Sequence, residues 1–295
     1  MSNYGIIVTV RPTRQPIDTA ALFDASYAES KQSPVDQFLE NCLVLNRQWS
    51  SLGPTEDVVP EVSRLILVGY VSAVEGYMRS LIRKLIHCDP YSQALCATQQ
   101  LSYAAALHHE PDMLPDALLE EVSFSTQKEI EKSLPKYVGL KSLSAGSKRL
   151  IEEFDQILHV RHCCTHRFGK LGAKNATALG LQTHGSLLEK PVKLSKAALE
   201  SVADLTFSMV KSINNDVFTF VLHRAATERL PDASTPGLGW KWNKAQDRKM
   251  FARYYDMFAS TRDAQPSPTR DSLYELFRAQ YRKVGTTAAK PAGAA

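Results

Sequence analysis

The pattern of hydrophobic and polar positions along the chain predicts an assembly of amphipathic helices. Apolar side chains recur at intervals of three and four residues, the spacing that places them on one face of a helix. Over residues 60–87 they cover most of the circumference, as expected for a helix at the centre of a core. Further helices are expected over residues 17–30, 35–52, 91–109, 115–132, 150–169, 195–228, 243–262 and 269–283.

Capping and helix-breaking residues predict where these helices begin and end. Pro60 suits a first helical turn, Ser144 or Ser147 is expected to cap the helix that contains residues 150–169, and Ser195 caps the next one. The intervening segments carry prolines and glycines and are expected to be irregular: residues 133–147, and residues 169–194 with an extended piece at 177–181.

The two ends of the chain differ from the helical centre. Residues 4–10 are β-branched and predict a short strand, while the end of the chain is rich in Ala, Gly, Lys and Pro and predicts disorder. The expected parts are an N-terminal strand with helices at 1–57, a helical bundle at 58–230, a linker and small helical extension at 231–285, and a disordered tail at 286–295.

Composition places the chain among ordinary soluble proteins, with 44% hydrophobic and 22% charged residues. No apolar run approaches the roughly 20 residues that a membrane span requires, and the N-terminus does not resemble a secretory signal. The odd number of cysteines, with Cys163 next to Cys164, favours reduced thiols. We therefore expect a cytoplasmic protein with no membrane partner.

Charge is distributed unevenly along the chain. Residues 1–127 carry 8 Lys and Arg against 15 Asp and Glu, a net charge of −7, whereas residues 128–174 carry 10 against 5, a net charge of +5. Residues 240–283 also carry 10 against 5. Such basic blocks indicate a surface for a polyanion, although charged stretches are equally typical of solvated helix faces.

The helix at residues 150–169 carries the most informative pattern. Its apolar stripe consists of Leu150, Ile151, Phe154, Ile157 and Leu158, and one turn later the same stripe reaches Arg161. Burying a guanidinium costs several kcal/mol unless it is paired or hydrogen-bonded. The stripe therefore either ends at Arg161 or directs a permanent charge into a crevice, and His162 and His166 follow.

The sequence Arg161-His162-x-x-x-His166, near the end of a hydrophobic helix, resembles the R-x4-6-H motif of HEPN-domain ribonucleases. The resemblance covers about residues 58–230. It implies an all-α bundle of long antiparallel helices, a homodimer in which two copies of the motif face each other, and RNA cleavage that needs no metal or other cofactor. It also implies a toxin or anti-phage effector, with an antitoxin or regulatory partner.

Glu75 lies within the apolar surface of residues 60–87 and needs a cation nearby. Arg161 is one candidate, and the resemblance agrees, because some HEPN families carry a Glu on their first long helix. The alternative is an exposed position paired with Arg79, four residues further along the helix.

Arg161 and His166 supply the chemistry that RNA cleavage needs. An imidazole titrates near neutral pH and can accept or donate a proton, and a guanidinium can hold two phosphate oxygens. Five residues separate the two by about 140° around a regular helix, so they converge only if the helix ends or distorts, or if two subunits contribute. With His162 and Glu75 they form the expected catalytic set. The products would be a 2′,3′-cyclic phosphate and a 5′-hydroxyl.

A second group of residues is expected to bind RNA. Arg167 and Lys170 follow the motif, and Trp240-Lys241-Trp242 begins the second basic block, where the indoles would stack on bases. The alternative for Trp240 and Trp242 is that they anchor the C-terminal helices to the core.

Three other interpretations remain open. Asp155, His159, His162 and His166 share one helix face and could include two metal ligands, although one straight helix cannot surround a metal. Cys163 or Cys164 could be a nucleophile. The bundle could also be a non-catalytic module for dimerisation or for binding RNA or protein, with Arg161 and His166 at a capped helix end.

Overall fold

The computed structural model describes residues 14–53, 57–231, 233 and 236–287, and within these residues the chain forms helices and no strand. The predicted all-α fold class is confirmed for this part of the chain. The strand expected at residues 4–10 and all but the first two residues of the expected tail lie outside it. The chain divides into two compact units, Met1–Lys31 and Gln32–Ala295.

The described part of the first unit holds a single 3-10 turn, η2 (Ala20–Leu22), in place of the helix predicted at 17–30. The backbone amide of Ala20 donates to Asp18 Oδ1 at 3.0 Å. No residue of η2 is buried. A short segment without a buried face has little to stabilise a helix, because most helix stability in proteins comes from tertiary packing.

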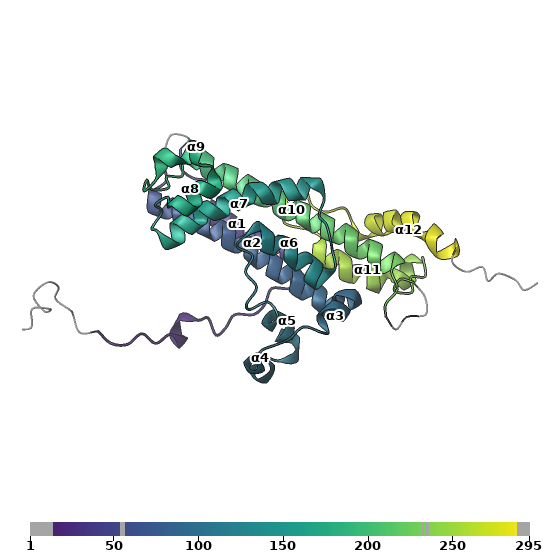
Figure 1. The fold of residues 1–295 in the computed structure, drawn as a ribbon. Coiled ribbons are helices and arrows are strands. Elements are labelled where there is room, and N and C mark those ends of the chain that lie inside the picture. Colours follow the sequence, from purple (N-terminus) through teal and green to yellow (C-terminus); the bar gives the residue numbers. More distant parts are fainter. Residues whose placement is uncertain (1–13, 54–56, 232, 234–235, 288–295) are drawn as a thin grey trace, which may run out of the picture. The chain divides into compact units, whose positions relative to one another are not determined.

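The second unit is organised around α2 (Pro60–Cys88), which packs against α1 (Pro34–Asn46), α7 (Ala145–His166), α10 (Lys196–Thr227) and α11 (Lys244–Phe258) (Figure 1). The central helix and the long helix after Ser195 were both predicted and are confirmed. So are two caps: Ser144 accepts a hydrogen bond from the amide of Ser147, and Ser195 accepts one from that of Ala198.

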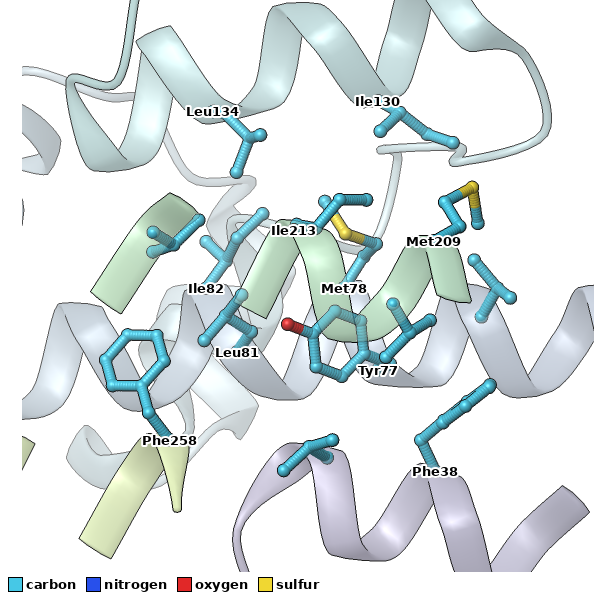
Figure 2. Close-up of a cluster of buried hydrophobic side chains, with 14 of the residues drawn as sticks. Phe38, Tyr77, Met78, Leu81, Ile82, Ile130, Leu134, Met209, Ile213 and Phe258 are labelled. Atoms are coloured by element: carbon cyan, nitrogen blue, oxygen red, sulfur yellow. The ribbon is translucent and has the colours of Figure 1, made fainter. Parts of the chain in front are cut away.

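The core forms where the apolar faces of these helices meet (Figure 2). Tyr77, Met78, Leu81 and Ile82 of α2 are essentially inaccessible to solvent. Their neighbours come from α1, the α6–η4 segment, α10 and α11: Phe38, Ile130, Leu134, Met209, Ile213 and Phe258. The hydrophobic stripe read from the sequence is thus the face that stabilises the bundle.

The same apolar character makes α2 long and hydrophobic enough to cross a membrane by length and composition. This corrects the expectation that no such stretch exists. However, 61% of its most apolar window is buried within the protein. The core helix of a soluble protein has the same properties, because it is surrounded by other helices.

α7 runs antiparallel to α10, and this arrangement fixes the position of the motif. At the start of α7, Ser147 Oγ lies 2.7 Å from Ser212 Oγ and donates to Asp216 Oδ2 at 2.6 Å, near the middle of α10. After its end, the carbonyl of Gly169 accepts from the amide of Val192 at 2.8 Å, just before α10 begins. The motif therefore lies at the N-terminal end of α10.

Several segments differ from the prediction. Residues 91–109 and 115–132 each form two short helices instead of one, because Ser102 and Thr126 cap new helices. Residues 133–147 include a π-helix, and residues 169–194 contain short helices separated at Gly180, so the extended piece at 177–181 was wrong. The bounds are α3 (Pro90–Cys96), α4 (Tyr103–His108), η3 (Pro111–Met113), α5 (Leu114–Ala117), α6 (Gln127–Ser133), η4 (Leu134–Val138), α8 (Ala173–Leu179), α9 (Leu181–His184), η5 (Gly185–Leu187) and α12 (Arg270–Thr287).

Candidate functional site

The predicted motif lies on the last turns of α7, where this helix packs against α2. Arg161 faces Glu75 of α2, with 3.7 Å between Nη2 and Oε1, and the two side chains are 25% and 23% exposed. Of the two partners that the sequence left open for Glu75, the structure pairs it with Arg161. The alternative partner Arg79 was wrong, since its guanidinium donates to the backbone carbonyls of Leu119 and Val122.

The ion pair leaves the Arg161 guanidinium with donors to spare. A separation of 3.7 Å is an electrostatic contact and is too long for a hydrogen bond. Within the described part of the chain, Nε of Arg161 has no hydrogen-bond partner, and neither has Oε1 of Glu75. Glu75 thus partly balances the charge of Arg161 without using its hydrogen-bond donors, of which Nε is buried and the Nη groups belong to a side chain that is 25% exposed.

His162 and His166 form a second pair, one turn apart on the exposed side of α7. Their ring centroids lie 4.5 Å apart with the planes inclined at 45°. Partial desolvation lowers the pKa of His162 below its ordinary value of 6.5, and the positive charges of His166, Lys174, Arg161 and His159 lower it further. His162 is therefore neutral at pH 7 and able to accept a proton.

The predicted convergence of Arg161 and His166 is not achieved by a distortion of the helix. α7 continues as an α-helix to His166, so the two side chains leave it in different directions. Arg161 turns toward α2, and the ring of His166 lies against that of His162 at an inclined angle. One copy of the motif thus presents an anchored cation beside an imidazole pair.

The side of α7 opposite Arg161 is fixed by α8. The side chain of Asn175 is buried and bridges two residues of α7: its Oδ1 lies 3.2 Å from His159 Nδ1, and its Nδ2 donates to Cys163 Sγ at 3.2 Å. Cys163 packs with Leu171 and Ala176 in a small cluster separate from the main core. These contacts fix the rotation of the last turns of α7, and with it the direction of the motif side chains.

Of the other predicted RNA-binding residues, two follow the motif directly. Arg167 forms an ion pair with Glu189, so its charge is partly neutralised. Lys170 is exposed, with its backbone paired to Pro191. Lys170 therefore remains a candidate for contact with phosphate, and Arg167 a weaker one.

The segment Trp240–Trp242 lies far from the motif. Trp240 is only 8% exposed and donates from Nε1 to the carbonyl of Ala225 at 2.9 Å, near the C-terminal end of α10. Its ring stacks on half-buried Trp242, and both pack against Phe277 of α12. Trp240 is therefore an anchor of the C-terminal helices and cannot stack on bases.

The length of α10 separates this segment from the motif, roughly 45 Å at 1.5 Å per residue. Lys241 is exposed there, with its amide bonded to Asp247. Lys241 and Trp242 thus do not belong to the motif's site within one chain.

The geometry supports neither the metal site nor the nucleophilic thiol that the sequence left open. Asp155 accepts from the amide of Gln127 and lies 3.7 Å from His159, and across the described residues no three His, Cys, Asp or Glu side chains gather as a metal site. All five cysteines are free, and burial raises the pKa of Cys164 to about 11, the wrong direction for a nucleophile.

Three residues that no sequence pattern pointed to lie near the motif: Lys174, Arg64 and Phe168. Lys174 is close enough to affect the pKa of His162, and Arg64 of α2 contacts Phe168, two residues after His166. The only feature of the sequence that could have pointed to them is Phe168 itself, an aromatic residue directly before Gly169.

No known family model, characterised protein or solved structure matches the chain. The HEPN resemblance therefore depends on the motif residues alone.

Proposed function

We propose that this protein is a metal-independent endoribonuclease of HEPN type. Arg161, His166, His162 and Glu75 form its catalytic site. The observation that carries the proposal is the half-buried Arg161 guanidinium, which Glu75 holds in place while donors remain free, beside a pair of histidines. A fixed cation next to a titratable imidazole is what cleavage of a phosphodiester without a metal requires.

The reaction is an attack within the RNA strand. An imidazole accepts the proton of the ribose 2′-hydroxyl, and the 2′-oxygen forms a bond to phosphorus. The bond from phosphorus to the 5′-oxygen breaks, and a second imidazole donates a proton to that oxygen. The products are a 2′,3′-cyclic phosphate and a 5′-hydroxyl, and Arg161 stabilises the charge that develops on the phosphate oxygens.

Two facing copies of the motif account for both proton transfers. His162 and His166 of one chain lie side by side, whereas the acid and base of this reaction act on opposite sides of the phosphate. A homodimer would bring a second histidine pair to the other side. The exposed side of α2 supports such a contact: Val62, Leu65, Ser72 and Gly76 are exposed at successive spacings of three, seven and four residues, and Gly76 directly follows Glu75.

The proposed substrate is single-stranded or transfer RNA. Lys170 and Lys174 add positive charge beside the motif, and a phosphate backbone is attracted to such a surface. From the resemblance we propose a cytoplasmic toxin or anti-phage effector, restrained by an antitoxin or regulatory partner.

The test is cleavage of single-stranded RNA and transfer RNA by the purified protein in excess EDTA, with analysis of the product ends. Arg161→Ala should lower the cleavage rate about 10²- to 10³-fold, the usual loss when one group that stabilises a transition-state anion is removed. Arg149→Ala is the matched control, since it removes an exposed Arg from the start of the same helix.

Each outcome assigns the protein to one class. Cleavage that survives both EDTA and Arg161→Ala would exclude the proposed site. Cleavage that EDTA abolishes would favour a metal-dependent hydrolase. If RNA binds and is never cleaved, the bundle is a binding module.

The pH dependence tests the role of His162. A base must be neutral to accept the 2′-hydroxyl proton, and because the pKa of His162 is lowered, this side chain becomes half-protonated only at a pH below 6.5. We therefore expect the acid-side decline of kcat/KM to have its midpoint below pH 6.5. The kcat/KM profile reports groups of the free enzyme, so it should be measured between about pH 4.5 and 8. A decline centred above pH 6.5 would show that another group is the base.

A further inference from the structure

Phe168 has an unusual conformation immediately after the motif. Its φ angle is +51°, in the left-handed region that a bulky residue rarely adopts, and its side chain is 77% exposed. The left-handed conformation is unfavourable for a residue with a bulky side chain, and the exposed ring gains little from burial to offset that cost. Strain of this kind persists where surrounding structure imposes it, and it is concentrated at functional sites.

Arg64 of α2 holds this conformation in place. Its Nη1 donates to the carbonyl of Phe168 at 3.2 Å, and its Nε donates to the carbonyl of Val192 at 2.9 Å. The guanidinium carbon lies 5.9 Å from the centre of the Phe168 ring. Gly169, with φ +90°, allows this approach, because a Cβ there would lie 2.7 Å from Arg64 Nε. Phe168 is thus a fixed aromatic platform with a cation over its ring.

The surroundings of the ring indicate what it would bind. Arg64 and Lys170 place positive charge beside the ring. The motif ends two residues before Phe168, at His166. Proteins that bind single-stranded nucleic acid combine such charge with exposed aromatic rings on which bases stack. An unpaired base can stack in this way, whereas a base within a duplex is already stacked on its neighbours.

We infer that Phe168 stacks on an unpaired base of RNA bound at the motif, and so makes single-stranded RNA or an unpaired loop the preferred substrate. This inference rests on the proposed function in placing RNA at the motif. Phe168 is a positioning residue: it holds the nucleotide next to the scissile phosphate and does not take part in proton transfer.

The competing occupant is a second copy of this chain, with Phe168 as an anchor in the dimer interface. Charged residues are depleted at the centre of protein interfaces. The ring of Phe168 instead lies under the guanidinium of Arg64, two residues before the exposed Lys170 in the chain. The charge around the ring therefore favours a nucleic acid over a second copy of the chain as its partner. The experiment below also measures the oligomeric state, to test this choice.

The experiment compares three variants of the full chain, each combined with His166→Ala so that bound RNA stays intact. Phe168→Asn removes the ring but keeps a residue that tolerates the left-handed conformation. Phe168→Trp keeps an aromatic face. Tyr103→Asn is the matched control, because Tyr103 is 81% exposed on α4. Affinity for a fluorescent single-stranded RNA of about 12 nucleotides, within the range of known site sizes, is measured by anisotropy in EDTA.

Phe168→Asn should weaken binding roughly 5- to 150-fold, which is the effect of losing one stacked base. Phe168→Trp and Tyr103→Asn should bind as the parent does. RNA with one abasic nucleotide gives a second readout. An abasic site at the stacked position should weaken binding to the parent by a similar factor and leave the already weak binding of Phe168→Asn unchanged.

Three results would overturn the inference. Phe168→Asn could bind RNA as tightly as the parent, or every abasic RNA could affect both proteins equally. Phe168→Asn could also convert a dimer into a monomer in sedimentation velocity, which would assign the ring to the interface. Cleavage by the wild-type chain separates the two proposals. If the wild-type chain cleaves RNA but Phe168→Asn does not change binding, only the inference about Phe168 is wrong. If binding depends on the Phe168 ring but no RNA is cleaved, only the nuclease proposal is wrong. If the chain does not bind RNA, both are wrong.

Discussion

His166→Ala should lower kcat/KM for RNA cleavage about 10²- to 10⁴-fold, the usual contribution of a general acid or base. His166 is exposed, and its ring contact in the structure is with His162, so the melting temperature should hardly change. The measurement is cleavage of a short fluorogenic RNA in EDTA at substrate concentrations far below KM, combined with a thermal melt of the same preparation.

A matched variant and a chemical rescue make this result specific. His108→Ala removes an exposed histidine at the end of α4 and should cleave RNA at the wild-type rate. Free imidazole should restore part of the activity of His166→Ala, because the missing group transfers a proton. An equal loss in both variants, or full activity in His166→Ala, would remove His166 from the catalytic site.

Asp89→Ala should lower the free energy of unfolding by about 3–5 kcal/mol, the usual cost of breaking a buried ion pair from one side. Asp89 is inaccessible to solvent. Its Oδ2 accepts from Arg224 and from the hydroxyl and amide of Ser92, and its Oδ1 accepts from Tyr254 Oη at 2.9 Å. Removing the carboxylate leaves the buried Arg224 charge without its partner, and urea unfolding of the purified protein measures the loss.

Two further variants test whether the unpaired charge is the cause. Asp271→Ala breaks an exposed ion pair with Lys244 and should unfold at nearly the wild-type urea concentration. The double variant Asp89→Ala with Arg224→Met should be more stable than Asp89→Ala, because it removes the stranded cation. A double variant that is no more stable than Asp89→Ala would mean that the lost hydrogen bonds, not the charge, account for the effect.

The features that the sequence predicted correctly are those decided by neighbouring residues. The apolar stripe of residues 60–87 predicted the central helix within one residue of its observed end at Cys88, and Ser144 and Ser195 predicted two helix starts. The position of Glu75 within an apolar surface predicted a cation nearby, with Arg161 as one of two candidates. The helix and its caps are local, because helix periodicity and capping depend on residues within a few turns. The choice of Arg161 over Arg79 as the partner of Glu75 was made by the packing of α7 against α2.

Other features depend on which segments meet in space, and only the tertiary structure decided them. The sequence could not choose between base stacking and core packing for Trp240, because the choice depends on the position of Ala225 and Phe277. It gave no sign that Arg64 would hold Phe168 in a left-handed conformation, since 104 positions separate the two. Such contacts are selected by long-range packing, which local periodicity does not encode, whereas the helices themselves follow from the order of apolar and polar residues.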